Sequence, residues 1–315
     1  YKLSTNMTVD QQPQQFLRQA CAELQEVAGL RWLTLQLTQD DPRLEDLAGE
    51  IFTAGPVDCD EPTLREVGRS LFQQYGAQFD PTVIEDVAAM QISALSGVVD
   101  NLLVVPLRTP GRPLGVLFGG DKLDGSSLTS VDSKLCNSLA STLAIFVENR
   151  MLYEDMHSMF LGTLHALTSA IDAKDSYTHG HTERVAKLAY MLAEAYGLDS
   201  ETTNRVYISG LVHDVGKIGV PEAVLCKPGK LTDEEFELIK MHPEIGARIL
   251  QDIRQMEDLL PGVLYHHERW DGRGYPKGLA GYDIPLFGRL IGLADAFDAM
   301  ISTRTYRSAM NLEDV

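Results

Sequence analysis

The sequence lacks the features that mark secreted, membrane-spanning or polymer-binding chains. Its four cysteines are scattered without CxxC spacing, which favours free thiols in a reducing compartment over disulfides. No apolar run is long enough for a membrane span and no signal peptide opens the chain, so we expect a cytoplasmic location. The net charge of −18 includes no basic block, which argues against a DNA or RNA polymer as ligand.

The composition is that of a globular protein. The 315 residues, of which 44% are hydrophobic, are enough for two domains. Because the chain begins at Tyr1 rather than at methionine, we expect a fragment of a longer protein. We also expect a C-terminal domain cut short at Val315, close behind the last recognisable motif.

The N-terminal part, residues 1–148, is predicted to be an α+β domain. Apolar residues at helical spacing predict a helix over 13–27, and alternation predicts a strand over 32–37. Two further apolar strands, 102–106 and 114–118, are separated by a turn with proline and glycine, which is typical of a hairpin. A helix, a strand, a late hairpin and a final helix indicate a sensor domain with an antiparallel sheet.

This late segment resembles the C-terminal half of a GAF domain. A related PAS-like domain is the alternative, since the matching motifs are generic. They are Val105-Pro-Leu107, Gly115-Val-Leu117, Leu128-Thr-Ser-Val-Asp132 and Val147-Glu-Asn-Arg150.

A connecting helix is predicted over residues 131–172, where there is no proline and only Gly162 interrupts the pattern. A parallel pair of such helices would make a homodimer stalk; the alternative is one helix packed on its own domains. The apolar residues that recur at near-heptad intervals are Leu135, Leu139, Leu143, Phe146, Met151, Met159 and Leu164.

Residues 173–315 are predicted to form an all-α domain that carries the chemistry. Imidazoles and carboxylates are ligands of borderline metals, and this series exceeds what one closed site needs. It therefore predicts at least two metals, an arrangement typical of phosphate-ester hydrolysis, whereas His157, His165 and His179 are interpreted as structural. The series consists of His181, His213-Asp214, His242, His266-His267 and Asp295.

Residues 175–307 closely resemble the HD-GYP domain, the bacterial cyclic di-GMP phosphodiesterase branch of the HD superfamily. The matching motifs are Lys174-Asp-Ser-Tyr-Thr-His-Gly-His-Thr-Glu-Arg-Val185, His213-Asp-Val-Gly-Lys-Ile-Gly-Val-Pro221, Lys240-Met-His-Pro-Glu-Ile-Gly246, His266-His-Glu-Arg-Trp-Asp-Gly-Arg-Gly-Tyr-Pro276, Ala294-Asp-Ala-Phe-Asp-Ala-Met300 and Thr303-Arg-Thr-Tyr-Arg307.

The resemblance implies a metal ligand set with Asp214 as the bridging carboxylate. Some relatives have a third metal and a glutamate where this chain has Tyr177, so we predict two divalent transition metals; weak binding of a third through His181 is the alternative. Iron or manganese is favoured, and nickel, cobalt and zinc remain open. The implied ligands are His181, His213, Asp214, His242, His266, His267 and Asp295.

The resemblance also predicts how substrate is held. Lys217 lies beside the predicted metals and would neutralise a phosphate oxygen, while Arg304 and Arg307 would clamp a phosphate or stack on guanine. Gly274-Tyr275-Pro276 would form part of the pocket wall and a surface for a signalling-protein partner. Trp270 is predicted to lie in the core.

The predicted function is hydrolysis of a cyclic dinucleotide by a metal-bridging hydroxide, with His213, Asp214 and Lys217 as the catalytic residues. Cyclic di-GMP would give 5′-pGpG and further cleavage would give GMP; 3′,3′-cyclic GMP-AMP is a second candidate substrate. The alternatives are a generic HD phosphohydrolase and a catalytically weak cyclic dinucleotide receptor. The GAF-like domain would regulate the activity.

Overall fold

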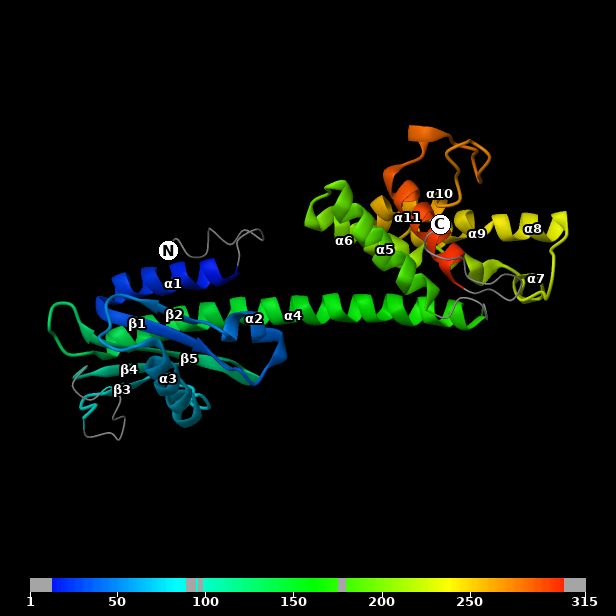
Figure 1. The fold of residues 1–315 in the computed structure, drawn as a ribbon. Coiled ribbons are helices and arrows are strands. Elements are labelled where there is room, and N and C mark those ends of the chain that lie inside the picture. Colours follow the sequence, from blue (N-terminus) through cyan, green and yellow to red (C-terminus); the bar gives the residue numbers. More distant parts are fainter. Residues whose placement is uncertain (1–12, 89–94, 96–98, 175–179, 303–315) are drawn as a thin grey trace. The chain divides into compact units, whose positions relative to one another are not determined.

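The structure is a computed structural model that describes residues 13–88, 95, 99–174 and 180–302 (Figure 1). The chain divides into two compact units, Tyr1–His157 (unit 1) and Ser158–Val315 (unit 2). None of the helices in the described ranges has both the length and the apolar character that a membrane crossing requires.

Unit 1 contains a five-stranded sheet in the order β2-β1-β5-β4-β3, and every neighbouring pair is antiparallel. The predicted hairpin is confirmed, since β4 pairs with β5 from Leu102↔Gly120 to Thr109↔Arg112. The elements before the connecting helix are α1 (Pro13–Ala28), β1 (Leu30–Leu37), η1 (Pro42–Leu44), α2 (Glu45–Ala48), β2 (Ile51–Ala54), α3 (Glu61–Tyr75), β3 (Thr82–Ile84), β4 (Leu102–Thr109) and β5 (Arg112–Lys122).

Helices cover both faces of this sheet, because residues of alternate parity along each strand face opposite sides. Helix α1 and the first part of α4 (Ser130–Lys174) cover one face, and α3 covers the other (Figure 1). Along β1, Leu33 and Leu35 belong to the core under α1, whereas Trp32 packs in the core under α3. The result is a three-layer α/β/α arrangement, consistent with the predicted α+β domain.

The apolar residues on α4 do not form the seam that the heptad pattern predicts. Leu143, Met151 and Leu164 are buried within the cores of their own units, and Leu135, Leu139 and Phe146 pack against the core of unit 1. A helix that covers a sheet needs an apolar stripe at nearly the same spacing as a coiled coil, so the pattern alone could not separate the two uses. Of the predicted set, only Met159 is largely exposed.

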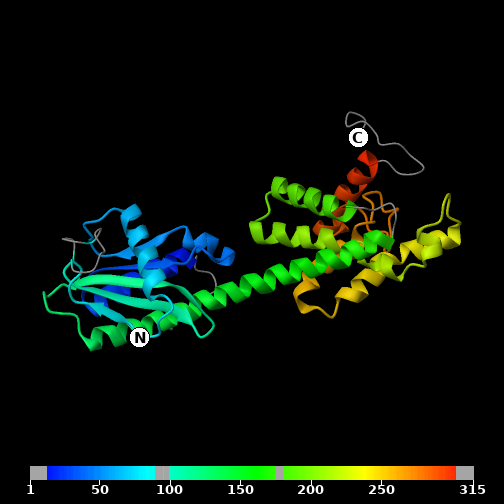
Figure 2. The same ribbon diagram turned by 90° about the horizontal axis from the view of Figure 1, so that it is seen from below.

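Unit 2 is helical, as predicted, and α5 and α6 lie side by side in it (Figures 1 and 2). The segment before His266 is not one continuous α-helix: a 3₁₀ segment precedes a new α-helix whose first turn contains Pro261. The elements after α4 are α5 (His181–Tyr196), α6 (Ser200–Val212), η3 (Val215–Gly219), α7 (Glu222–Leu225), α8 (Asp233–Lys240), α9 (His242–Leu250), η4 (Arg254–Leu259), α10 (Leu260–Tyr265), η5 (Gly281–Asp283) and α11 (Leu286–Ile301).

Two glycines let the elements of unit 2 approach closely around its centre. A Cβ atom on Gly216 of η3 would lie 1.8 Å from the carbonyl oxygen of His242, and one on Gly292 of α11 would lie 2.4 Å from that of His266. Both distances are shorter than any van der Waals contact allows. The absence of a side chain at these positions therefore brings η3 against α9 and α11 against the end of α10.

Candidate metal centre

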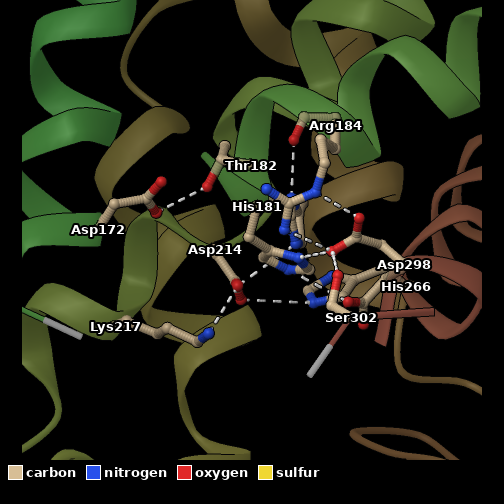
Figure 3. A network of polar contacts seen from close by, with 12 residues as sticks. Asp172, His181, Thr182, Arg184, Asp214, Lys217, His266, Asp298 and Ser302 are labelled. Carbon is tan, nitrogen blue, oxygen red and sulfur yellow. Dashed lines mark hydrogen bonds and ion pairs between the residues drawn. The ribbon is translucent and has the colours of Figure 1, made fainter. Parts of the chain in front are cut away.

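The side chains predicted as metal ligands come together in unit 2, although they lie on separate elements (Figure 3). Helix ends supply most of them, because a residue at a helix end can direct its side chain past the last turn into a shared space. His181 opens α5, His213 caps the C-terminal end of α6, His242 opens α9, His266 caps α10 and Asp295 lies within α11.

These side chains form two groups of donor atoms. Within each group the donor atoms lie within 4.8 Å of one another. We call them the Asp214 group (Asp214, His242, His266 and His267) and the His181 group (His181, His213 and Asp295).

The carboxylate of Asp214 lies between the two groups. Its Oδ1 is 3.2 Å from His242 Nε2, in its own group, while its Oδ2 is 3.3 Å from His213 Nε2, in the His181 group. A carboxylate whose two oxygens face two donor groups has the arrangement that a bridging ligand requires.

Three of the histidines are oriented by the same kind of hydrogen bond to the backbone of their own helical turn. The Nδ1 atoms of His213, His242 and His266 lie 2.7, 2.7 and 2.8 Å from the backbone carbonyl oxygen three residues earlier. A carbonyl oxygen only accepts, so Nδ1 carries a hydrogen, and Nε2 is the ring nitrogen that faces the centre and can bind a metal when the imidazole is neutral. This outer hydrogen bond is the one that metal-binding histidines ordinarily make.

The donor set fits a bound cation. His242 Nε2 and His266 Nε2 are 3.4 Å apart, and both present lone pairs, which repel each other unless a cation lies between them. Two nitrogens about 2.05 Å from a tetrahedral metal would be separated by about 3.3 Å. In addition, His213 Nε2 and Asp214 Oδ1 are buried and complete no hydrogen bond within the described residues.

Three of the donors have the protonation state that metal binding requires, whereas the neighbouring carboxylate of Asp214 outweighs burial and raises the pKa of His213. Burial, reinforced by neighbouring histidines, holds the pKa of His266 well below its ordinary value and lowers that of His267 to about 4. Burial alone would raise the pKa of Asp214, but Lys217 and the adjacent histidines hold it well below the usual range. These groups therefore offer neutral imidazoles and a carboxylate at neutral pH.

His181 and Asp295 form an ion pair in the second group. Burial disfavours the charged imidazole, but the carboxylates of Asp295 and Asp298 outweigh it and raise the pKa of His181 to about 9. The pKa of Asp295 is lowered despite its burial, chiefly by the hydrogen bond to His181. The distance from His181 Nε2 to Asp295 Oδ1 is 3.3 Å. A metal in this group would compete with the His181 proton.

Lys217 points its ammonium group at the centre. Its Nζ is 2.7 Å from Asp214 Oδ2, and the side chain is mostly buried. η3 turns immediately after Asp214, which places Lys217 three residues on and on the same side. The structure therefore places this cation beside the residues predicted as metal ligands, as the sequence predicts.

Sequence reasoning missed two residues that contact this centre. The carboxylate of Asp298, one helical turn after Asp295 on α11, lies 2.7 Å from His181 Nδ1, and Arg184 binds the same carboxylate. Asp298 stands out in the sequence as a second acid in a mostly apolar helix, but its partner His181 lies 117 residues away, so its contact with the centre could not be read from neighbouring residues.

The predicted substrate-binding residues are only partly described. The ring of Tyr275 lies 4.8 Å from that of His267, and Gly274 packs tightly against the backbone around Glu268. Pro276 follows a cis peptide bond. Arg304, Arg307, His179 and Tyr177 lie outside the described residues. The prediction that Trp270 lies in the core is wrong: it is 61% exposed and packs edge-on against exposed Tyr282.

This helical unit gathers histidine and aspartate side chains from separate helices into two candidate metal-binding groups. Residues 165–314 match the family model described as HD domain. The C-terminal unit is thus an HD domain, and its resemblance to the HD-GYP branch is confirmed by the relatives below.

Three curated relatives illustrate the likeness. A cyclic di-GMP phosphodiesterase of Thermotoga maritima is 43% identical over 166 residues, covering 51% of this chain and 44% of the relative. The cyclic di-GMP phosphodiesterase response regulator RpfG of Xanthomonas campestris is 34% identical over 238 residues, covering 74% and 59%. The 3′3′-cGAMP-specific phosphodiesterase 1 of Vibrio cholerae is 38% identical over 170 residues, covering 54% and 38%. The chain thus spans between 38% and 59% of the length of these relatives.

Proposed function

We propose that this chain is a metal-dependent phosphodiesterase that hydrolyses a cyclic dinucleotide, cyclic di-GMP or 3′,3′-cyclic GMP-AMP, to the linear dinucleotide. The observation that carries the proposal is the carboxylate of Asp214 between two groups of donor atoms. The names of the relatives supply the substrate class. Cleavage of cyclic di-GMP would give 5′-pGpG and, on a second cut, GMP.

Two divalent metals, with iron or manganese favoured over nickel, cobalt and zinc, complete the proposal. When bound, such a pair would act as a Lewis acid toward a water molecule and the phosphate oxygens. The residues of the chain hold and orient it: the Asp214 group would bind one metal and the His181 group the other. Asp214 would be shared, and the histidines would keep their Nδ1 hydrogens on the partners described above.

Turnover of both cyclic dinucleotides by metal-loaded protein, followed by separation of the products, tests this function. The expected product is the linear dinucleotide from at least one of the two. Tight binding of a cyclic dinucleotide without any product would instead support the receptor alternative. Hydrolysis of mononucleotides alone would support a generic phosphohydrolase.

Lys217 is predicted to act on the substrate rather than on the metals. In the Lys217→Met variant we expect kcat to fall about a hundredfold, the loss expected when one positioned charge-stabilising group is removed. Metal content should be unchanged, since Lys217 is not a ligand. Elemental analysis beside steady-state kinetics measures both quantities.

The matched control is Lys240→Met, which also removes a lysine paired with an acid three residues away, Glu237, but on the outside of α8. It should retain wild-type kcat. Loss of metal from Lys217→Met in parallel with its activity would contradict a role on the substrate and indicate that the ammonium group only organises Asp214.

Residues of the Gly-Tyr-Pro loop, together with Arg304 and Arg307, remain part of the proposed substrate pocket. The contact of Tyr275 with His267 supports this assignment, because it places an aromatic ring beside the Asp214 group. A signalling-protein partner at the same loop also stays a prediction.

Regulation by the N-terminal unit, proposed to be a GAF-like sensor, is supported by contacts at the end of α4. Lys174 Nζ donates to the carbonyl oxygens of Ile218 (3.0 Å) and Val220 (2.9 Å), directly after Lys217. Asp172 accepts a hydrogen bond of 2.8 Å from Thr182, next to His181 (Figure 3). A change in the last turn of α4 would therefore reach both sides of the metal centre.

Because all of the predicted seam residues except Met159 are packed in their own units, the proposed homodimer through α4 requires other contact residues. Ile145, Leu152 and Met156 are 56%, 57% and 62% exposed, and with exposed Asn149 they follow the 4-3-4 spacing of a coiled-coil seam. An asparagine at one inward position is a device that sets register in parallel dimers. A second copy of this helix is thus the partner that fits the stripe.

Charged residues in this stripe should separate the subunits. Each leucine or methionine buried in the seam contributes about 1.5–3 kcal/mol. We expect Leu152→Glu/Met156→Glu to raise the dimer dissociation constant at least about a hundredfold. Analytical ultracentrifugation measures this effect. The proposed seam predicts that wild type and the control Leu123→Glu sediment as dimers and that the double variant sediments as a monomer. Leu123 is equally exposed but lies off α4. A dimeric double variant would exclude this seam.

A further inference from the structure

His181 is held differently from three other histidines of the centre. His213, His242 and His266 each direct Nδ1 at a neutral backbone carbonyl within their own helical turn. His181 instead directs Nδ1 at the carboxylate of Asp298, 2.7 Å away and 117 residues further along the chain (Figure 3). The orientation of His181 therefore depends on how α5 packs against α11.

The carboxylate of Asp298 is buried in the interior of unit 2 and is not exposed at the protein surface. Its side chain is 1% exposed, and a buried carboxylate is costly unless it is paired. Arg184, one turn after His181 on α5, donates from Nε to Oδ1 at 2.7 Å and from Nη2 to Oδ2 at 3.0 Å. This fork-like contact fixes the carboxylate plane and leaves Oδ2 directed at the imidazole.

Helix α11 thus holds a single imidazole ring by both nitrogens. Asp295 and Asp298 are three residues apart and share a face of the helix; Asp295 lies at Nε2 and Asp298 at Nδ1. A carboxylate at Nδ1 fixes the tautomer, and it makes Nε2 a stronger electron donor than a carbonyl at Nδ1 would.

We propose that Asp298 and Arg184 are a positioning pair that controls metal binding in the His181 group alone. The inference rests on the proposed function in that it assumes metals at this centre. The Asp214 group should not depend on the pair, because its oriented histidines use backbone carbonyls. The two metals would consequently be held with unequal and separately adjustable strength.

The test is metal retention by Asp298→Asn, a nearly isosteric change that removes the charge and the reason for the Arg184 contact. Protein loaded with manganese and dialysed against graded chelator is measured by elemental analysis. We expect one of the two metals to be lost at about 10- to 100-fold lower chelator strength than in wild type, the usual effect of removing an outer partner. The other metal should dissociate as in wild type.

Asp258→Asn is the matched control, since it removes another aspartate–arginine pair of unit 2, the pair with Arg205, away from the centre. It should retain both metals as wild type does. Arg184→Gln is a second variant that leaves the Asp298 carboxylate in place. It should weaken the same metal to a smaller degree, and it keeps the proposal testable if Asp298→Asn does not fold.

The outcomes separate the inference from the proposed function. Wild-type retention of both metals in Asp298→Asn and Arg184→Gln would overturn the inference and leave the proposed function intact. Equal weakening of both metals would also overturn it, because it would indicate a general structural role. Wild-type protein that binds no metal would instead remove the proposed function on which the inference rests.

Discussion

The Asp214→Asn variant is expected to lose at least about a thousandfold in turnover of cyclic dinucleotide, the upper range for loss of one preorganised electrostatic group. Both oxygens of Asp214 are used, one toward His242 and one toward His213. An amide presents one oxygen and one NH₂ group, which repels a cation. The carboxylate bridge between the two donor groups would therefore be broken while the side-chain volume is kept.

Product analysis by chromatography and elemental analysis on the same preparations measure this effect. Metal content should fall together with activity. Asp271→Asn is a suitable control because it removes the exposed pair with Arg269, in the loop that follows the His266-His267 doublet. Activity of Asp214→Asn within tenfold of wild type would show that the bridge is not needed.

Removal of metal is expected to destabilise unit 2 and to leave unit 1 unchanged. Lone pairs of His242 and His266 face each other at 3.4 Å, and Asp214 is buried beside them. A metal present at about a thousand times its dissociation constant stabilises the fold by about 4 kcal/mol. For a unit of this size, 1 kcal/mol corresponds to about 2–4 °C in Tm, so chelation should lower its Tm by about 8–16 °C.

Differential scanning calorimetry with and without chelator measures this shift. Unit 1 serves as an internal control, since the described residues of its sheet and helices include no group of metal donors. Addition of manganese after chelation should restore the higher transition. A transition of unit 2 that does not move with chelator would contradict the proposed metal centre.

The residues proposed as metal ligands could be singled out in the sequence because their sequence context is local. His213 and Asp214 follow an apolar helical segment, so their place at a helix end could be inferred from neighbouring residues. The role of Asp298 could not, since it arises where α11 packs on α5 and depends on residues more than a hundred positions apart. Tertiary packing of this kind leaves no periodic signal in the sequence.

In unit 1, too, the sequence predicted most of the long elements but not those that depend on tertiary packing. The hairpin of β4 and β5 was recognisable from two long apolar strands, whereas β2 and β3 have only four and three residues and show no pattern. Helix α3 could have been found, since Leu64, Val67 and Leu71 are at helical spacing behind the N-cap Asp60. On α4, burial of Leu143 and Met151 depends on a sheet that the helix sequence does not reveal.

The most direct test of the central claim is turnover of cyclic di-GMP and 3′,3′-cyclic GMP-AMP by wild-type protein whose metal content per chain is measured at each step of chelation and reloading. The account predicts two metals per chain at full activity, loss of linear product as metal is withdrawn, and recovery when it is returned. Undiminished hydrolysis by protein without metal would contradict it.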